Sequence, residues 1–270
     1  MTFVIAEIGW NHMGDMSLAE KMILKASQAG AKFAKFQTWS VKRLKNGEWD
    51  NDGRRQIYEK AELTFQDHEL LIKLCQKYSI DFLSSCFSLE DAKLLRQLNQ
   101  KKIKIPSFEV RNIKLLEFCL SNFEHVFIST GTANLEDLSN LQKLVDKYST
   151  TVMHCVSSYP CKEENANLPR ISCLSEMFGD VGYSDHVGGI DASIASLEYQ
   201  PSHIEKHFTI DNELPGRDNK FAILPNELFR LTSYIKNKKL LNINHGIDYQ
   251  ICEENSRNEY QGRFAKFDSQ

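Results

Sequence analysis

Short apolar runs alternate with longer amphipathic stretches along most of the chain. Runs rich in Val, Ile and Phe, bounded by polar residues or Gly, predict eight β-strands. These strands are expected at residues 3–9, 32–37, 81–86, 102–106, 125–130, 151–156, 180–185 and 203–208. Apolar residues at helical spacing predict helices at residues 17–29, about 66–78, 88–98, 112–121, 134–147, 168–177, 189–199 and 225–239. This alternation predicts parallel βαβ units and therefore an α/β fold.

Eight such units favour a closed (β/α)₈ TIM barrel, because closure leaves no exposed sheet edge. A doubly wound open sheet is the alternative that the pattern leaves open. We expect residues 1–240 to form the barrel, and the polar, aperiodic residues 241–270 to form a C-terminal tail or the start of a linker. Residues 38–64 are long and polar for a connection after a strand, so we expect a lid or binding loop there.

Unusual polar side chains lie within or just after each of the eight predicted strands. In a TIM barrel the carboxyl ends of the strands meet at one face, where the active site is built. A buried charge is costly unless it is paired or ligated, so this distribution indicates a polar cavity rather than packing. The candidates include Glu7, Lys35, Gln37, Ser85, Lys104, Ser107, Glu109, Ser129, His154, Ser157, Tyr159, Ser184, Asp185, His186, Glu205, Lys206 and His207.

The residue types indicate a pocket for a small phosphorylated acid beside a divalent metal. Lys35 and Lys104 supply positive charge, and several strand-end serines supply hydroxyl donors. His186 and His207 end adjacent strands, and two imidazoles with water or substrate oxygen suit Mn²⁺ or Zn²⁺. A hydrogen-bonded pair of core histidines is the alternative reading of these two residues.

Two carboxylates complete this candidate pocket. Glu7 and Glu109 are candidates for acid–base catalysis or for binding sugar hydroxyls.

Composition narrows the class of protein. Of the 270 residues, 41% are hydrophobic and 26% are charged, and the net charge of -3 provides no basic field for nucleic acid or an anionic membrane. The sequence shows no apolar run of membrane-helix length and no signal-peptide pattern. The seven cysteines contain no C-x-x-C pair, so we expect reduced thiols in a cytoplasmic protein.

Nine strings contain most of these polar residues: IAEIGWNHMGD (5–15), AKFQ (34–37), FLSSCF (82–87), KIPSFE (104–109), ISTGT (128–132), HCVSSYP (154–160), GYSDHVGGI (182–190), IEKHFTID (204–211) and PGRD (215–218). In this order and spacing they resemble the N-acetylneuraminate (sialic acid) synthase family, which includes legionaminate and pseudaminate synthases. The first string, GYSDH and EKHFTID are the most specific.

The resemblance implies an enzyme that condenses phosphoenolpyruvate with N-acetylmannosamine or a related amino sugar, using Mn²⁺ or Mg²⁺. His186 and His207 match the metal ligands of the family, and Glu109 matches the acidic group near the attacking water. The matches to phosphoenolpyruvate contacts are Lys35, Ser85, Lys104, Ser107, Ser129, Ser157 and Ser184. The matches to the sugar pocket are Glu7, Tyr159 and Asp218.

The sequence departs from the family pattern at the phosphate and sugar sites. Phe108 replaces the second glycine of G-S-G-E, Ser84-Ser85-Cys86 stands for S-T-P, and Arg217 and Asn219 change P-G-P-D-H. Family members normally continue into an antifreeze-like domain that, in a homodimer, supplies an arginine to the partner's sugar site. We therefore expect either a barrel fragment or a short member in which Arg217 or Arg263 supplies that charge to a sugar without an N-acetyl group.

Two other functions remain open on the sequence. One is another phosphoenolpyruvate-dependent 3-deoxy-sugar-acid synthase with a different aldose acceptor. The other is a catalytically silent sugar-binding barrel, which the Phe108 change makes worth testing.

Overall fold

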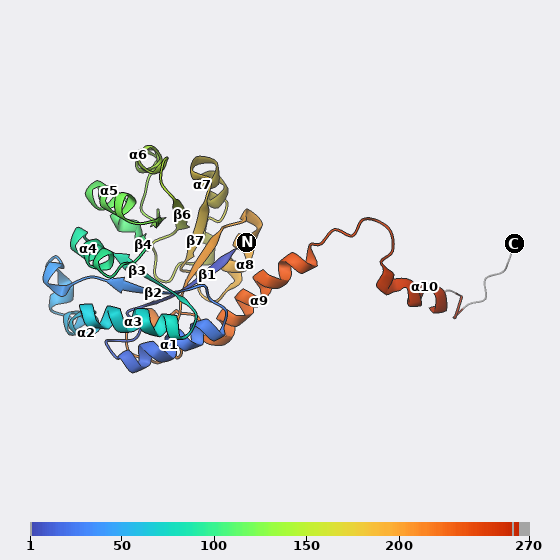
Figure 1. The fold of residues 1–270 in the computed structure, drawn as a ribbon, viewed down its shortest axis with the longest axis horizontal. Coiled ribbons are helices and arrows are strands. Elements are labelled where there is room, and N and C mark those ends of the chain that lie inside the picture. Colours follow the sequence, from blue (N-terminus) through green and yellow to red (C-terminus); the bar gives the residue numbers. More distant parts are fainter. Residues whose placement is uncertain (1, 261, 265–270) are drawn as a thin grey trace. The chain divides into compact units, whose positions relative to one another are not determined.

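The computed structural model describes residues 2–260 and 262–264. They form a barrel unit that ends at Ile235 and a C-terminal unit that begins at Lys236. The strands of the barrel unit form one closed parallel barrel in sequence order, β1 to β8 (Figure 1). Their bounds are Phe3–Gly9, Phe33–Thr38, Asp81–Cys86, Lys102–Ile105, His125–Ser129, Thr150–Cys155, Val181–Asp185 and His203–His207. The predicted TIM barrel is confirmed, and the open-sheet alternative is wrong.

Helices surround the barrel and connect successive strands (Figure 1). They are α1 (Met16–Gln28), α2 (Arg54–Ala61), α3 (Phe65–Lys77), α4 (Leu89–Gln97), α5 (Ile113–Asn122), α6 (Leu135–Val145), α7 (Arg170–Phe178), α8 (Asp191–Ser196) and α9 (Pro225–Leu241). Short 3₁₀ turns, η1 to η6, lie at Val41–Arg43, Glu48–Asp50, Ser107–Glu109, Glu163–Asn165, Leu197–Tyr199 and Asp218–Lys220. The α1 helix begins one residue before its expected start, because the Asp15 carboxylate accepts hydrogen bonds from the N–H groups of Ser17 and Leu18.

The long connection after β2 contains a helix that hydrophobic periodicity did not reveal. This helix, α2, carries Tyr58 into the wall of the central pocket, and the Tyr58 ring lies 5.4 Å from the ring of Trp10. The helix approaches the β1–α1 loop so closely that a side chain on Gly14 would meet the Lys60 carbonyl oxygen at 1.9 Å. Gly14 also has φ +77°, which favours glycine. The segment therefore covers part of the pocket, as expected of a binding loop.

The barrel interior is built in layers because residues two apart on a strand face the same side. An apolar layer consists of Ile5, Phe33, Leu83, Phe127 and Met153. Two positions further along the same strands come Glu7, Lys35, Ser85, Ser129 and Cys155, all of which line the pocket. Strand periodicity thus places a polar layer directly above an apolar plug.

The outer faces of the strands pack against the helices in two larger apolar clusters. One contains Ile8, Phe36 and Leu71, and the other contains Ile105, Leu116 and Ile128, all fully buried. Burying such side chains stabilises the barrel by about 25 cal/mol per Å² of apolar surface removed from water. The strands are therefore held by apolar packing, while the pocket carries the polar groups.

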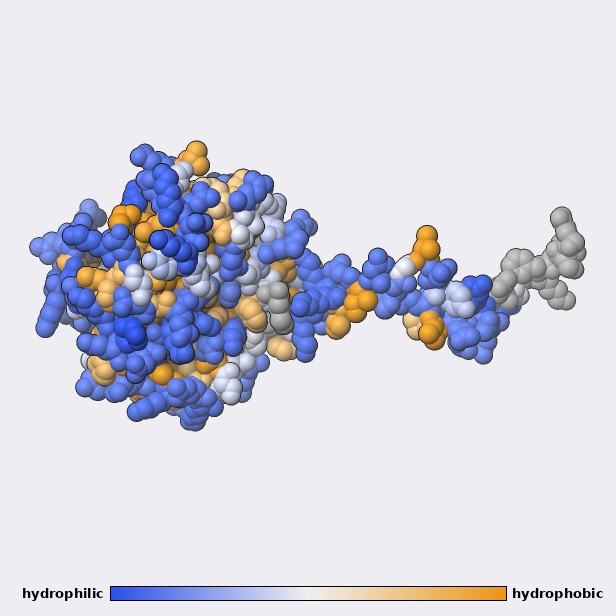
Figure 2. All heavy atoms as spheres, turned by 45° about the horizontal axis from the view of Figure 1, so that its top comes forward, coloured by the Kyte–Doolittle hydropathy of each residue, from blue (hydrophilic) through white to orange (hydrophobic). Residues whose placement is uncertain are grey.

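The C-terminal unit contains the last residues of α9, η7 (Ile251–Glu253) and α10 (Glu254–Tyr260), and neither of these last two elements buries a residue. Figure 2 shows a mostly hydrophilic surface on the barrel unit, with apolar side chains scattered across the visible face. No helix in residues 2–260 or 262–264 is long and apolar enough to cross a membrane. Residues 261 and 265–270 of the expected tail lie outside the described residues.

Candidate active site

One pocket opens at the carboxyl ends of the strands and is lined by residues from all parts of the barrel. Its lining consists of Glu7, Trp10, Lys35, Gln37, Tyr58, Ser85, Phe87, Lys104, Pro106, Ser107, Phe108, Ser129, Cys155, Tyr159, Ser184, His186, Glu205, His207, Arg217 and Asp218. Of the residues matched to a metal, phosphoenolpyruvate or sugar role, all lie in this lining except Glu109 and Ser157, while the candidates His154, Asp185 and Lys206 also lie outside it. The strand-end polar residues therefore converge on one cavity.

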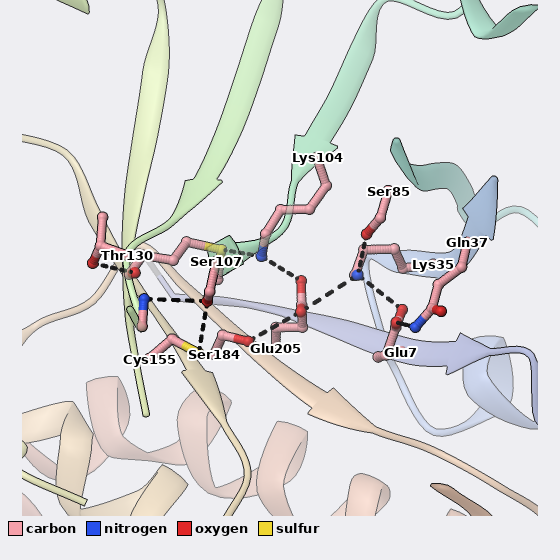
Figure 3. Close-up of polar contacts among 12 residues, drawn as sticks. Glu7, Lys35, Gln37, Ser85, Lys104, Ser107, Thr130, Cys155, Ser184 and Glu205 are labelled. Carbon is pink, nitrogen blue, oxygen red and sulfur yellow. Dashed lines mark hydrogen bonds and ion pairs between the residues drawn. The ribbon is translucent and has the colours of Figure 1, made fainter. Parts of the chain in front are cut away.

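Buried lysines and glutamates form a continuous ion network at the base of the pocket. Lys35 Nζ lies 3.0 Å from Glu7 Oε2 and 3.4 Å from Glu205 Oε1. Lys104 Nζ lies 2.9 Å from Glu205 Oε2, so Glu205 bridges the two lysines (Figure 3). All four side chains belong to residues that are at most 6% exposed. The formal charges cancel, which is the condition for keeping such groups away from water.

The two glutamates have opposite proton affinities. Burial raises the pKa of Glu7 to about 7, and the opposing attraction of Lys35 does not overcome it. Burial also acts to raise the pKa of Glu205, but the charges of Lys104 and Lys35 outweigh it and lower the pKa to about 2. Glu205 is therefore a permanent anion, whereas Glu7 can exchange a proton near neutral pH.

The ion network also shifts the pKa values of the two lysines. Burial would lower the pKa of Lys35, but the carboxylates of Glu205 and Glu7 raise it above its usual value. Burial lowers the pKa of Lys104, which has Glu205 as its carboxylate partner and Lys35 as a repelling neighbour. Both ammonium groups stand inside the pocket, where a small anion would meet them away from bulk solvent.

Serine hydroxyls contact this ion network and line the same pocket. The Ser85 hydroxyl accepts a hydrogen bond from Lys35 Nζ at 2.8 Å, and the Ser184 hydroxyl donates to Glu205 Oε1 at 3.1 Å. Ser129 Oγ is buried and has no hydrogen-bond partner in the protein. A buried hydroxyl without a partner is costly, so a ligand oxygen in the pocket is its natural partner.

The backbone at Gly131 lies close to the hydroxyl groups of Ser107 and Ser157. The Gly131 N–H donates to Ser107 Oγ at 3.1 Å, and the Ser107 hydroxyl donates to Cys155 Sγ at 3.2 Å. A Cβ atom on Gly131 would lie 2.3 Å from Ser157 Oγ and 2.8 Å from Ser107 Oγ. Only glycine therefore permits this close contact between the loops after β4, β5 and β6.

His186 and His207 lie side by side with ring centres 5.5 Å apart, and His186 Nδ1 is 3.7 Å from Cys155 Sγ. His186 Nδ1 is 3.0 Å from the Val156 carbonyl oxygen, which can only accept, so Nδ1 carries a proton and Nε2 is the ring nitrogen left to face an ion. His207 Nδ1 is buried without a hydrogen-bond partner. Burial lowers the pKa of His207, which favours the neutral imidazole that binds metals.

These two imidazoles fit a divalent ion. Nitrogen ligands sit about 2.0–2.2 Å from such ions, and rings at this spacing can each turn one nitrogen toward a shared ion. No group of three His, Cys, Asp or Glu side chains that could hold a metal occurs in the described part of the chain. Water and substrate oxygen would therefore supply the remaining ligands.

The rim of the pocket near the histidines carries hydrogen-bonding and aromatic groups. The Tyr159 ring lies 4.3 Å from the His186 ring and 6.2 Å from the His207 ring. The Trp10 indole N–H donates to Asp218 Oδ2 at 3.1 Å, and the same oxygen is 3.8 Å from His207 Nδ1. This rim can hold a polyhydroxylated molecule next to the candidate metal ligands.

Glu109 and Ser157 are not brought into the lining. Glu109 ends the η3 turn, and its carboxylate accepts a hydrogen bond from the Asn112 side chain at 2.8 Å. Phe108 lines the pocket instead, stacked on Phe87 with ring centres 5.7 Å apart. Ser157 Oγ stays behind the Gly131 loop, 3.8 Å from Cys155 Sγ. Their predicted contacts with substrate stay predictions.

Other strand-end candidates face the helices rather than the pocket. Lys206 and Asp185 form a buried ion pair, with Nζ 3.0 Å from Oδ2, and neither lines the pocket. His154 Nε2 is 2.8 Å from the Ala166 carbonyl oxygen, and its ring stacks on that of Tyr183. These three residues serve packing, as the alternation along each strand requires.

Sequence reasoning named Glu205 but gave it no role, although it joins the two lysines at the centre of the network. The available signal was its position two residues before His207, on the inward face of β8. Gln37 was likewise named without a role: its side-chain amide donates to Glu7 Oε1 at 2.8 Å and holds that carboxyl in place.

A closed parallel barrel with buried lysines, acid–base groups and paired histidines at its carboxyl face is the architecture of TIM-barrel enzymes. The family model of the NeuB family matches residues 22–245. The chain belongs to the NeuB family.

Named relatives cover most of the chain. It is 36% identical to the N,N'-diacetyllegionaminic acid synthase of Campylobacter jejuni, over 87% of this chain and 75% of the relative. It is 32% identical to the N-acetylneuraminate-9-phosphate synthase of Drosophila melanogaster, over 89% and 69% respectively. A crystal structure of the N-acetylneuraminic acid (sialic acid) synthetase of Leptospira borgpetersenii, in complex with citrate, matches with a TM-score of 0.83 at 32% identity, covering 97% of this chain and 91% of that chain.

Proposed function

We propose that this chain condenses phosphoenolpyruvate with an N-acetylmannosamine-like sugar aldehyde to give a nonulosonic acid and phosphate. The observation that carries the proposal is that one pocket holds two buried lysines, four serines and two histidines suited to a divalent metal. The names of the relatives, which are synthases of legionaminic acid and of a phosphorylated neuraminic acid, support this reaction class.

Phosphoenolpyruvate would bind at the base of the pocket. Lys35, Lys104 and the unsatisfied Ser129 hydroxyl offer charge and hydrogen-bond donors to its phosphate and carboxylate. In this network the lysines are neutralised by Glu7 and Glu205. Protonation of Glu7, whose pKa is about 7, leaves the network with one net positive charge and so favours anion binding.

The reaction balances with one water molecule. C3 of phosphoenolpyruvate forms a bond to the aldehyde carbon while the aldehyde C=O π bond breaks and its oxygen takes up a proton to become a hydroxyl. C2 develops positive charge that the bound phosphate and the nearby carboxylates stabilise. Water adds to C2 and loses a proton, and the hemiketal phosphate then collapses to the ketone and inorganic phosphate. No Schiff-base lysine is needed, because the enol is already held as a phosphate ester.

His186 and His207 would hold Mn²⁺ or Mg²⁺ beside the acceptor. When bound there, such an ion supplies Lewis-acid polarisation of a carbonyl oxygen. Asp218, Trp10 and Tyr159 then position the sugar hydroxyls on the same side of the pocket.

Glu7 is the carboxyl group best placed for proton transfer. It lines the pocket and has a pKa near neutrality, as an acid–base catalyst requires. Glu109, the group expected to activate water, has its carboxylate bonded to Asn112 outside the lining. We therefore assign the acid–base role to Glu7, and a role for Glu109 requires its side chain to turn inward when substrate binds.

A phosphate-release screen tests the function. Purified protein with phosphoenolpyruvate and Mn²⁺ is supplied with mannosamine, N-acetylmannosamine, diacetamido hexoses and neutral aldoses. Release with amino sugars alone supports the proposal, whereas release with neutral aldoses alone identifies another 3-deoxy-sugar-acid synthase. Binding of both substrates without release under any divalent metal would establish the silent barrel instead.

Replacing Gly131 by alanine should weaken phosphoenolpyruvate binding. The new methyl group would collide with the hydroxyl groups of Ser107 and Ser157 and displace them. We therefore expect the KM for phosphoenolpyruvate to rise about 10- to 100-fold. Gly188→Ala is the matched control, because a Cβ atom there meets nothing within 4 Å. Equal KM values in the two variants would contradict the proposed binding of phosphoenolpyruvate beside Ser107 and Gly131.

The raised pKa of Glu7 predicts a pH-dependent stability. Its folded-state pKa of about 7 exceeds the ordinary 4.5, so the unfolded chain loses this proton first as the pH rises from 4.5 to 7. The free energy of unfolding should therefore fall by roughly 2–3 kcal/mol over that window, relative to Glu7→Gln. Urea denaturation at pH 4.5, 6 and 7.5 measures the difference. The lowered pKa of Glu205 changes the free energy of unfolding only below pH 4.5, so its effect lies outside this pH window. The same pH slope in both proteins would show that Glu7 is not shifted.

We also propose that the enzyme works in the cytoplasm, where its seven free cysteines would stay reduced. A homodimer, as the family resemblance implies, is testable by sedimentation of the full chain.

A further inference from the structure

We propose that Arg217 binds a negatively charged group, a phosphate or a carboxylate, on the end of the acceptor sugar that lies away from the aldehyde. This inference rests on the proposed function, because it names the acceptor class for the same pocket. It assigns a specificity role to a residue at which the sequence departs from the family pattern.

Arg217 is an unpaired cation in a pocket whose other cations are paired. Lys35 and Lys104 each have a carboxylate within 3.0 Å. Within the described residues, no carboxylate lies within 4.0 Å of the Arg217 guanidinium, which donates one hydrogen bond, from Nη2 to the Tyr159 carbonyl oxygen at 3.3 Å. A lining arginine with most of its donors free is suited to an anion that enters the pocket.

The loop that carries Arg217 is pinned rather than free. The fully buried Asn219 side chain donates to the carbonyl oxygens of Asn11 and Pro215, at 3.2 and 2.8 Å, and its oxygen accepts from the Thr209 hydroxyl at 2.5 Å. Gly216, with φ +111°, makes the turn that precedes Arg217. The backbone that carries Arg217 is therefore held at the rim of the pocket.

The position of Arg217 selects the acceptor rather than phosphoenolpyruvate. Its guanidinium carbon lies 6.0 Å from the centre of the Tyr159 ring, which itself contacts both His186 and His207. The next residue, Asp218, lies on the same side. An acceptor whose aldehyde faces the histidines would extend its far end along this rim, past Tyr159 to Arg217.

The chemistry of the guanidinium favours an anion over a neutral acyl group. Its parallel N–H donors match two oxygens of a phosphate or carboxylate, and charge-assisted bonds of this kind are about twice as strong as neutral ones. An acyl carbonyl offers a single neutral acceptor. Arg263 lies in the C-terminal unit, where its guanidinium faces the rings of Tyr260 and Phe264.

Acceptor kinetics test the proposal with N-acetylmannosamine and its 6-phosphate, followed as loss of phosphoenolpyruvate. In the unaltered chain we expect the KM for the phosphorylated sugar to be at least about tenfold lower. Arg217→Ala should raise that KM about 10- to 100-fold and leave the KM values for N-acetylmannosamine and phosphoenolpyruvate within about twofold. Arg217→Lys keeps the charge but loses the paired N–H donors of the guanidinium. Its KM for the phosphorylated sugar should lie between the values of the unaltered chain and of Arg217→Ala.

Lys220→Ala is the matched control, because it removes a positive charge from the same loop at an exposed position outside the pocket lining. It should leave the preference for the phosphorylated sugar intact. The proposal is overturned if Arg217→Ala changes the KM of both sugars equally, of the neutral sugar alone, or of neither. If no sugar consumes phosphoenolpyruvate although calorimetry shows that it binds, the proposed function fails as well; turnover with an unchanged preference overturns only the role of Arg217.

Discussion

Replacing Glu205 by glutamine is expected to lower the free energy of unfolding by about 3–5 kcal/mol, because it leaves two buried ammonium groups without their shared carboxylate. Lys104 would lose its carboxylate partner at 2.9 Å, and Lys35 would keep Glu7 alone. Urea denaturation at neutral pH measures the loss. Added phosphoenolpyruvate should restore part of the stability, since its charges can replace the missing carboxylate.

The control for this experiment is an ion pair at the surface. Glu124→Gln removes the partner of Lys101, and both side chains there are about two-thirds exposed or more. Exposed pairs contribute less than about 1 kcal/mol, so this variant should unfold almost like the unaltered chain. Similar losses in the two variants would mean that the central network is not a tightly coupled buried unit.

Replacing His207 by alanine is expected to abolish metal-dependent turnover, with a fall of at least about 100-fold in kcat. The variant should also lose Mn²⁺ binding measured by calorimetry, while circular dichroism shows an intact barrel. The reason is the arrangement of His207 and His186, whose ring centres are 5.5 Å apart, with a His207 nitrogen left unsatisfied by the protein.

An exposed histidine provides the comparison for this metal prediction. His245→Ala alters a side chain at the surface of the C-terminal unit and should change neither metal binding nor turnover. Removal of metal by a chelator should stop the unaltered enzyme, and added Mn²⁺ should restore it. Full activity or full Mn²⁺ affinity in His207→Ala would remove this residue from the metal site.

Loop residues show where local pattern stops being informative. Glu109 and Ser157 follow strands whose direction was predicted correctly, yet neither reaches the pocket lining. Glu109 lies in a 3₁₀ turn and bonds to Asn112, while the neighbouring Phe108 faces the pocket. Beyond a strand end, the direction of a side chain depends on the path of the loop. That path is decided by contacts with residues far away in the sequence. A motif match predicts the order of such residues along the chain but not the direction in which their side chains point.

The same limit explains what was missed in the binding loop. The α2 helix has no apolar stripe, and it is stabilised by its contacts with the β1–α1 loop and the pocket rim rather than by its own periodicity. Arg217 lines the pocket for a comparable reason: Asn219 ties its loop to Asn11, which is 208 residues earlier in the chain.

The amino-acid sequence by itself determined the barrel and the composition of its polar layer. Strand periodicity places Glu7, Lys35 and Glu205 on the inward face whatever the loops do, because alternate residues on a strand point to the same side. Only the tertiary structure decided that Glu205 bridges two lysines, that Glu7 holds its proton to about pH 7, and which loop residues meet at the rim. Those properties arise from distances and burial between segments far apart in the chain, which no local pattern encodes.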